Sequence, residues 1–178
     1  MSHVLPPLPV PAVPVVGGEP GARFPVHRIY CVGRNYADHA IEMGGTGREA
    51  PFFFMKPADA IVPVEEGARG RVEFPSLTQD LHHEVELVVA IGRGGRDITA
   101  ANALDHVWGY AVGLDLTRRD LQAAAKKEGR PWDIAKGFEQ SAPIGPIRAA
   151  AQCQPGADAA IALDVNSQTR QRSVLGKM

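Results

Sequence analysis

The sequence predicts an α+β fold that is rich in strands, with a mixed sheet and a few short inserted helices. Its apolar segments are short, rich in Val, Ile and aromatic residues, and bounded by turns that contain Gly, Pro, Asn or Asp. The helical segments do not alternate regularly with these strands, as they would in a parallel α/β sheet. With 178 residues, 44% of them hydrophobic and 22% charged, the chain can form one domain with a full-sized core.

Five segments have the composition of strands, and most of them end at a recognisable turn. The second segment is closed by Lys56-Pro57, the third by GRGGRD at 92–97, and the fifth by Asn166-Ser167. The five predicted strands are residues 28–33, 52–55, 83–91, 107–114 and 159–165.

Three shorter segments are typical of helices. Thr99 and Thr117 are suitable N-cap residues for the second and third of them. Asp120 suits the first turn of the third helix, and Gly129 begins the Gly-Arg-Pro sequence that ends it. The three predicted helices are residues 36–43, 100–106 and 118–128.

Residues 1–25 differ from the rest of the chain because they hold seven of its fifteen prolines. We expect them to form an extended arm that leads into the fold or packs on its surface. A Pro-rich ligand for a partner protein is the alternative, because such segments favour the polyproline II conformation. Residues 26–178 have an even composition without an internal repeat, so we expect them to form a single domain.

The charge and the cysteine content argue against several classes of protein. Nineteen Lys and Arg residues against twenty Asp and Glu residues give a net charge of −1, whereas nucleic-acid binding needs a clustered basic surface. Cys31 and Cys153 form neither a disulfide framework nor a C-x-x-C site. No apolar run approaches the ~20 residues of a membrane span, and the proline-rich N-terminus is unlike a signal peptide. We therefore expect a cytoplasmic protein that binds neither nucleic acid nor a membrane.

Two glutamates stand inside the apolar strand LHHEVELVV, residues 81–89. Side chains two residues apart on a strand point to the same face, so Glu84 and Glu86 project side by side. Val85 and Leu87 face the other way, toward a core. Two adjacent carboxylates in such a strand are costly unless a cation compensates them. A solvent-facing sheet edge is the alternative, because it shows the same alternation.

Asp115 supplies a third carboxylate at the end of the apolar segment VWGYAVGLD. Because Asp also favours caps and turns, a structural role ahead of Thr117 is the alternative. Three carboxylates on strands would form a hard site of oxygen ligands, which suits Mg²⁺ or Mn²⁺. Zinc is disfavoured because no His/Cys cluster has ligand spacing, and only one of His82 and His83 can face the glutamates.

Two further elements could supply acid–base or charge-stabilising groups. His39 and Glu42 are three residues apart in a predicted helix, so the carboxylate could orient the imidazole as a general base for water. Lys136, between Ala135 and Gly137, could stabilise an oxyanion. The alternatives are an exposed His–Glu pair on a polar helix face and an ordinary solvent-facing lysine.

Five segments together resemble the fumarylacetoacetate hydrolase family in their order and intervals, and they cover most of residues 28–147. They are IYCVGRNYADHAIEMG, PFFFMKPADAI, LHHEVELVVAIGRGGRDI, VWGYAVGLDLTRRDLQ and PWDIAKGFEQSAPIGP. The VGRNYADH opening and the Lys-Pro after an aromatic run are similar to the small acylpyruvate branch. That branch includes the fumarylpyruvate hydrolases of the gentisate pathway of aromatic catabolism, acylpyruvases and oxaloacetate decarboxylases.

The resemblance implies a mixed β-roll of the family's C-terminal-domain type, assembled as a homodimer and dependent on Mg²⁺ or Mn²⁺. By position, it implies that the metal ligands are Glu84, Glu86 and Asp115, the water-activating pair His39 and Glu42, the charge-stabilising residue Lys136, and the substrate-holding residues Arg119 and Gln122. The family continues for some tens of residues beyond the turn near Asn166, with a Thr-Gly-Thr-Pro segment that lines the substrate's carboxylate. This chain stops at Met178 without it, so we expect the C-terminal part of the family fold to be missing.

The activity that the resemblance implies is metal-dependent hydrolysis of a carbon–carbon bond in a small 2,4-dioxo acid. Fumarylpyruvate, which would give fumarate and pyruvate, is the first expectation among these acylpyruvates. Oxaloacetate decarboxylation is an alternative, because the same metal and enolate serve it without attack by water. A metal-binding homologue that acts as a structural or interaction module, without catalysis, is a further alternative.

Overall fold

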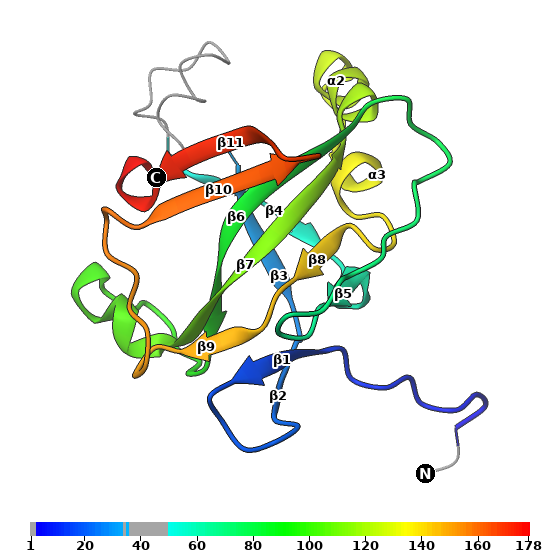
Figure 1. Cartoon of the computed structure of the whole chain (residues 1–178). Coiled ribbons are helices and arrows are strands. Elements are labelled where there is room, and N and C mark those ends of the chain that lie inside the picture. The colour runs from blue at the N-terminus through cyan, green and yellow to red at the C-terminus, as the bar shows by residue number, and fades with distance from the viewer. Residues whose placement is uncertain (1–2, 34, 36–49) are drawn as a thin grey trace.

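The computed structural model describes residues 3–33, 35 and 50–178, and strands dominate this part of the chain (Figure 1). Within these residues, seven strands form one mixed sheet in the order β2-β1-β9-β7-β8-β5, and β6 pairs with β7 as well. The β1/β9 and β5/β8 pairs are parallel and the other pairs are antiparallel. The predicted strand-rich α+β fold is therefore confirmed. The strands of this sheet are β1 (Ala12–Val16), β2 (Arg23–Pro25), β5 (Ile61–Pro63), β6 (Leu81–Ile91), β7 (Val107–Arg118), β8 (Ala142–Ile144) and β9 (Ile147–Ala149).

Two antiparallel hairpins accompany the main sheet in the described part of the chain. One pairs β3 (Ile29–Gly33) with β4 (Phe52–Lys56), and the other pairs β10 (Ala160–Val165) with β11 (Gln168–Val174). The second hairpin turns at Asn166 and Ser167, whose φ angles of 51° and 62° are both left-handed. Two-residue hairpin turns of this kind match the twist of the strands, so the predicted turn at these residues is confirmed.

The helices of the described residues are short, and they lie between strands or at the end of the chain. They are the 3-10 helices η1 (Ala58–Ala60), η2 (Ala100–His106) and η3 (Leu175–Lys177), and the α-helices α2 (Arg119–Glu128) and α3 (Asp133–Lys136). Segment 100–106 is helical as predicted, but Thr99 at its N-cap makes no side-chain cap hydrogen bond. None of these helices is long and apolar enough to cross a membrane.

Helix α2 starts one residue later than predicted, and Thr117 is not its N-cap. Strand β7 runs four residues beyond the predicted end, because Arg118 still pairs with Leu81 of β6. Thr117 is therefore a buried strand residue, and its hydroxyl donates a hydrogen bond to the carbonyl oxygen of Asp115 at 3.1 Å. The predicted helix end is confirmed, since Gly129 has a left-handed φ of 64° and caps the last turn.

The β6–β7 ribbon is the longest paired element and sets the position of the site. Its register places Glu84 opposite Asp115 and Glu86 opposite Gly113. Residues 92–106, including η2, connect the two strands, so GRGGRD begins a long connection and not a tight hairpin turn. Directly opposed residues share a face of the ribbon, so its carboxylates point to one side.

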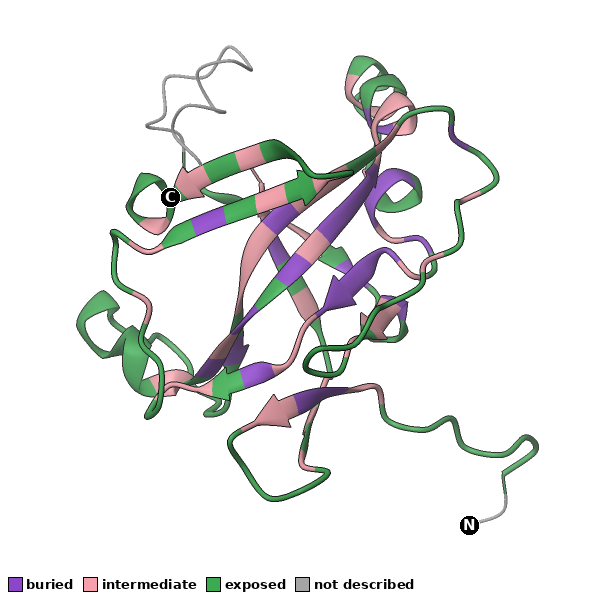
Figure 2. Cartoon of the chain, viewed as in Figure 1, coloured by how far each residue is buried: buried purple, intermediate pink, exposed green. Residues whose placement is uncertain are grey.

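The buried core adjoins these carboxylates on the same face of the ribbon. Val88 packs against a buried cluster that consists of Val13, Ala90, Ala111, Ile144 and Ile147. Figure 2 shows buried residues along the neighbouring strands of the sheet. A Cβ atom at Gly113 would lie only 2.7 Å from Cγ2 of Val88, so glycine permits this packing beside the site. Val85 is buried on the opposite face, as predicted, but the principal core cluster is not on that side.

The N-terminal segment contributes to the sheet. Within residues 1–25, β1 and β2 form an antiparallel pair, and β1 continues into a parallel pairing with β9. Val13 of β1 is only 1% exposed and belongs to the core cluster. Each such buried aliphatic side chain contributes about 1.5–3 kcal/mol to folding.

Candidate metal centre

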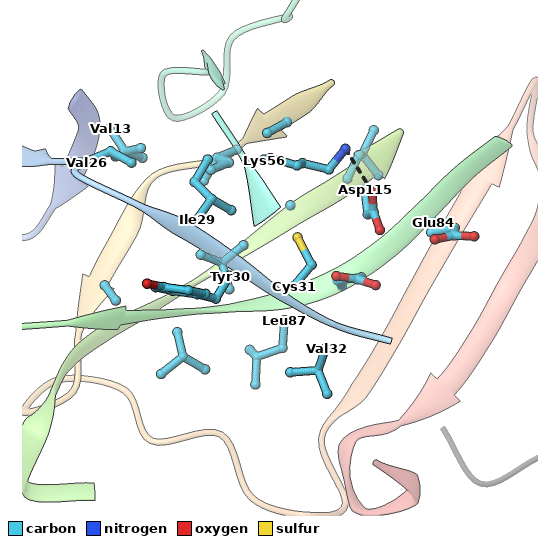
Figure 3. Close-up of a pocket in the computed structure, with 18 of the residues that line it drawn as sticks. Val13, Val26, Ile29, Tyr30, Cys31, Val32, Lys56, Glu84, Leu87 and Asp115 are labelled. Carbon is cyan, nitrogen blue, oxygen red and sulfur yellow. Dashed lines mark ion pairs between the residues drawn. The ribbon is translucent and has the colours of Figure 1, made fainter. Parts of the chain in front are cut away.

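Glu84, Glu86 and Asp115 come together on one face of the β6–β7 ribbon, as the sequence predicted. Figure 3 labels Glu84 and Asp115. Each offers one carboxylate oxygen, and these three oxygens lie within 4.8 Å of one another. Alternation along β6 aligns the two glutamates, and the cross-strand register brings Asp115 opposite Glu84. The ribbon thus presents a compact set of hard oxygen donors.

Lys136, at the end of α3, lies between two of these carboxylates. Its Nζ is 2.7 Å from Oε2 of Glu84 and 2.5 Å from Oδ2 of Asp115. The residue is only 3% exposed, so the alternative of a solvent-facing lysine is excluded. The two carboxylates compensate the buried ammonium group, which would otherwise be costly at this depth.

Lys56 is a second buried lysine at this site, and the sequence did not identify it as a site residue. It is 2% exposed, and its Nζ lies 2.9 Å from Oδ1 of Asp115 (Figure 3). The ammonium also donates to the carbonyl oxygen of Leu116 at 3.1 Å and to that of Lys136. Burial lowers the pKa of Lys56, and the Asp115 carboxylate opposes that change. Lys56 therefore links β4 to both β7 and α3.

Helix α2 adds a polar edge to the site through Arg119 and Gln122. The Arg119 guanidinium pairs with Oε1 of Glu84 and donates to Oε1 of Gln122 at 2.5 Å. Its Nε also donates to Nδ1 of His82 at 3.3 Å, and Nε2 of His82 lies 3.1 Å from Asp80. His82 is thus the histidine of the LHHE sequence that reaches this edge, and it contacts Arg119.

The two glutamates differ in their electrostatic surroundings. Burial would raise the pKa of Glu84, but Lys136 and Arg119 outweigh it and lower the pKa to about 2. Burial, with the neighbouring Asp115 and Glu84, raises the pKa of Glu86 to about 7. Among the described residues, Glu86 has no cationic partner within salt-bridge distance. A partly buried carboxylate beside two others, without a cation, fits the chemistry of a divalent-metal ligand.

The predicted water-activating pair and one cysteine have separate outcomes. His39 and Glu42, together with the predicted helix 36–43, lie outside the described residues. Cys31 is buried beside the carboxylates, and burial, followed by the charge of Asp115, raises the pKa of its thiol to about 12. The neutral thiol is a poor ligand for a hard cation, which leaves an oxygen donor set.

The comparisons with known proteins agree with this geometry. Residues 28–178 match the family described as fumarylacetoacetate (FAA) hydrolase C-terminal. A crystal structure of fumarylpyruvate hydrolase from Pseudomonas aeruginosa in complex with Mn²⁺ and pyruvate is similar to this chain, with a TM-score of 0.94 and 51% identity. That match covers 99% of this chain and 76% of the other, and it confirms the expected mixed β-roll.

Two curated relatives carry other activities in their names. The mitochondrial oxaloacetate tautomerase of Arabidopsis thaliana is 41% identical over 85% of this chain and 66% of its own length. The mitochondrial oxaloacetate decarboxylase of Dictyostelium discoideum is 45% identical over 66% of this chain and 52% of its own length. The chain therefore spans less than two thirds of these relatives. By its fold, its carboxylate cluster and the match over residues 28–178, the chain belongs to the fumarylacetoacetate hydrolase family.

Proposed function

We propose that this site hydrolyses the C3–C4 bond of a 2,4-dioxo acid, with fumarylpyruvate as substrate and fumarate and pyruvate as products. The observation that carries the proposal is the carboxylate cluster with Lys136 buried against it. Further support comes from the 51% identical fumarylpyruvate hydrolase, whose structure contains Mn²⁺ and pyruvate. Pyruvate is one of the two products of the proposed reaction.

Glu84, Glu86 and Asp115 would hold Mg²⁺ or Mn²⁺, since both ions favour carboxylate and water oxygens. When bound, the ion supplies a Lewis acid that polarises the 2-oxo group and favours enolate formation. Lys56 and Lys136 would orient Asp115, because both ammonium groups contact its carboxylate. Arg119 would orient Glu84 in the same way.

The chemical step requires a base and a stabilised oxyanion. We assign the base to His39, oriented by Glu42, which would take a proton from water as the oxygen attacks C4. The C3–C4 bond then breaks, its electron pair moves toward the 2-oxo group, and protonation at C3 gives pyruvate. Lys136 would contribute positive charge where the oxyanion develops, while Arg119 and Gln122 would help to hold the substrate.

The first test is the decay of absorbance of enolised fumarylpyruvate on mixing with the protein. We expect decay with Mg²⁺ or Mn²⁺ and none with EDTA, with fumarate and pyruvate formed in equal amounts. If the absorbance decayed with neither Mg²⁺ nor Mn²⁺, the result would contradict the proposal. Decay that continues unchanged in EDTA would contradict it as well.

The His39→Ala variant separates hydrolysis from the second candidate function, oxaloacetate decarboxylation, which the Dictyostelium relative favours. Loss of a general base is expected to lower kcat for fumarylpyruvate by about 10²–10⁴-fold, with unchanged metal affinity by titration calorimetry. Decarboxylation needs no attack by water, so activity on oxaloacetate that survives in this variant would favour the second function. Full hydrolysis by His39→Ala would exclude His39 as the base.

A further inference from the structure

The guanidinium group of Arg119 is held at all three of its nitrogens. Nη2 donates to Oε1 of Glu84, Nη1 donates to Oε1 of Gln122 at 2.5 Å, and Nε donates to Nδ1 of His82 at 3.3 Å. A guanidinium group has five N–H donors, so each terminal nitrogen keeps one N–H for a further acceptor. The three contacts together determine where this remaining pair of donors points.

The backbone at the start of α2 is fixed separately, by the residues that precede β6. The Arg119 amide donates to the carbonyl oxygen of Asp80 at 2.8 Å. The Asp120 carboxylate accepts hydrogen bonds from the Thr78 hydroxyl at 2.5 Å and from the Gln79 amide at 2.9 Å. The backbone end of the arginine side chain therefore keeps its place whatever happens at the guanidinium end. Loss of a contact at the guanidinium should change the orientation of that group and leave the fold intact.

The ability of His82 to accept this hydrogen bond depends on a further residue, Asp80. An arginine N–H can donate only to a ring nitrogen that carries no proton, so the ring proton of His82 is on Nε2. Nε2 lies 3.1 Å from Oδ1 of Asp80, which accepts the hydrogen bond from that nitrogen. Asp80 thus favours the tautomer in which Nδ1 faces Arg119. Both side chains are about half exposed and line the same cavity as Glu84.

We propose that His82 is a positioning residue, which holds the Arg119 guanidinium in the orientation that binds the carboxylate of the 2-oxo acid. The inference rests on the proposed function, in which Arg119 helps to hold the substrate, and it adds a residue that acts through Arg119. The contacts to Glu84 and Gln122 fix the two terminal nitrogens, and these define an axis. The His82 contact at Nε stops the group from pivoting about that axis and turning its remaining N–H donors away from the substrate.

The His82→Leu variant tests this role by binding and by turnover. We expect pyruvate to bind the Mn²⁺-loaded variant about tenfold more weakly than the wild type. The KM for fumarylpyruvate should rise by a similar factor, with a smaller change in kcat. Metal affinity and melting temperature should stay unchanged, because His82 is half exposed and Glu84 keeps its contacts with Arg119 and Lys136.

Two further variants show whether the loss belongs to the hydrogen bond at Nδ1. His82→Asn should retain most of the pyruvate affinity, because its amide oxygen can replace Nδ1 as the acceptor for Nε of Arg119. His83→Leu is the matched control, since strand alternation turns this neighbouring histidine to the opposite face of the ribbon, and its pyruvate affinity should equal that of the wild type. Equal losses in His82→Leu and His82→Asn would contradict the assigned hydrogen bond.

A double-mutant cycle separates positioning through Arg119 from a direct contact between His82 and the ligand. Methionine at position 119 has no N–H donor, so His82→Leu should cause no further loss of pyruvate affinity in an Arg119→Met background. The same loss in both backgrounds, or an unchanged pyruvate affinity in His82→Leu, would overturn the proposal. A metal-loaded wild type that binds no pyruvate would overturn it too. If the wild type binds pyruvate but does not cleave fumarylpyruvate, the proposed function fails, and the pyruvate affinities still decide on His82.

Discussion

Replacing Glu86 with glutamine is expected to lower kcat/KM at least about a thousandfold, because it removes one of the three carboxylates that would hold the metal. The same substitution should stabilise the metal-free protein at pH 8. Burial and two neighbouring carboxylates raise the pKa of Glu86 to about 7, so the native state at pH 8 contains a charge that it disfavours. Glutamine removes that charge without removing a partner from any described cation.

The pH dependence of this gain has a definite sign. The folded-state pKa of Glu86 lies above its unfolded value of 4.5, so the wild type loses stability as the pH rises from about 4.5 to 7. Glu86→Gln should therefore match the wild type near pH 4 and exceed it above pH 7, on the order of 2 kcal/mol. Chemical denaturation in EDTA at both pH values measures this difference, and metal titration measures the lost affinity.

Two control variants make the Glu86 result interpretable. Glu139→Gln changes an exposed glutamate and should alter neither metal affinity nor stability. Asp115→Asn also removes a proposed ligand but leaves Lys56 and Lys136 without their shared carboxylate, so it should destabilise the protein. If Glu86→Gln bound metal normally, or if it were less stable than the wild type at pH 8 in EDTA, the assignment of Glu86 would be wrong.

Replacing Lys56 with methionine is expected to lower the free energy of unfolding by about 3 kcal/mol and metal affinity by about 10–100-fold. The substitution removes the ammonium that pairs with Asp115 and that donates to the carbonyl groups of Leu116 and Lys136. These contacts hold Asp115 and the backbone of Lys136 in place, so their loss should misplace a ligand. Thermal unfolding in EDTA measures the change in stability, and calorimetric titration with metal measures the change in metal affinity.

The stability and affinity changes separate a positioning role from a merely structural one. If Lys56 only supports the fold, Lys56→Met should be destabilised yet keep its metal affinity below its melting temperature. If Lys56 positions Asp115, high metal concentrations should restore part of the lost activity. Lys127→Met, at an exposed position on α2, controls for the loss of a lysine.

The carboxylate cluster was predictable from the sequence because strand alternation is a local property. Glu84 and Glu86 share a face whatever the rest of the fold does, and Asp115 is conspicuous at the end of an apolar segment. Their mutual distance was not predictable in the same way, because it depends on the register between β6 and β7. The connection 92–106 is too long to determine that register by turn type.

Lys56 was missed because its partners are distant in the sequence. In the sequence, Lys56 follows the predicted strand FFFM and precedes Pro57, and this context is typical of an exposed strand end. Only the tertiary structure places it against Asp115, Leu116 and Lys136. The short strands β5, β8 and β9 were missed for a related reason, since pairing across the sheet, and not local composition, makes them strands.

The dependence of the site on Lys56 bears on the design of artificial metalloproteins. The three carboxylates lie on one contiguous stretch, residues 81–118, which makes the bare ribbon an attractive graft. Separated from β4 and α3, that ribbon would carry its acidic cluster without either buried lysine. Repulsion among the three carboxylates would then favour a shifted register between the two strands, in which Asp115 and the glutamates lie on opposite faces. A graft that keeps Lys56 and Lys136 together with the three carboxylates must therefore include at least residues 56–136.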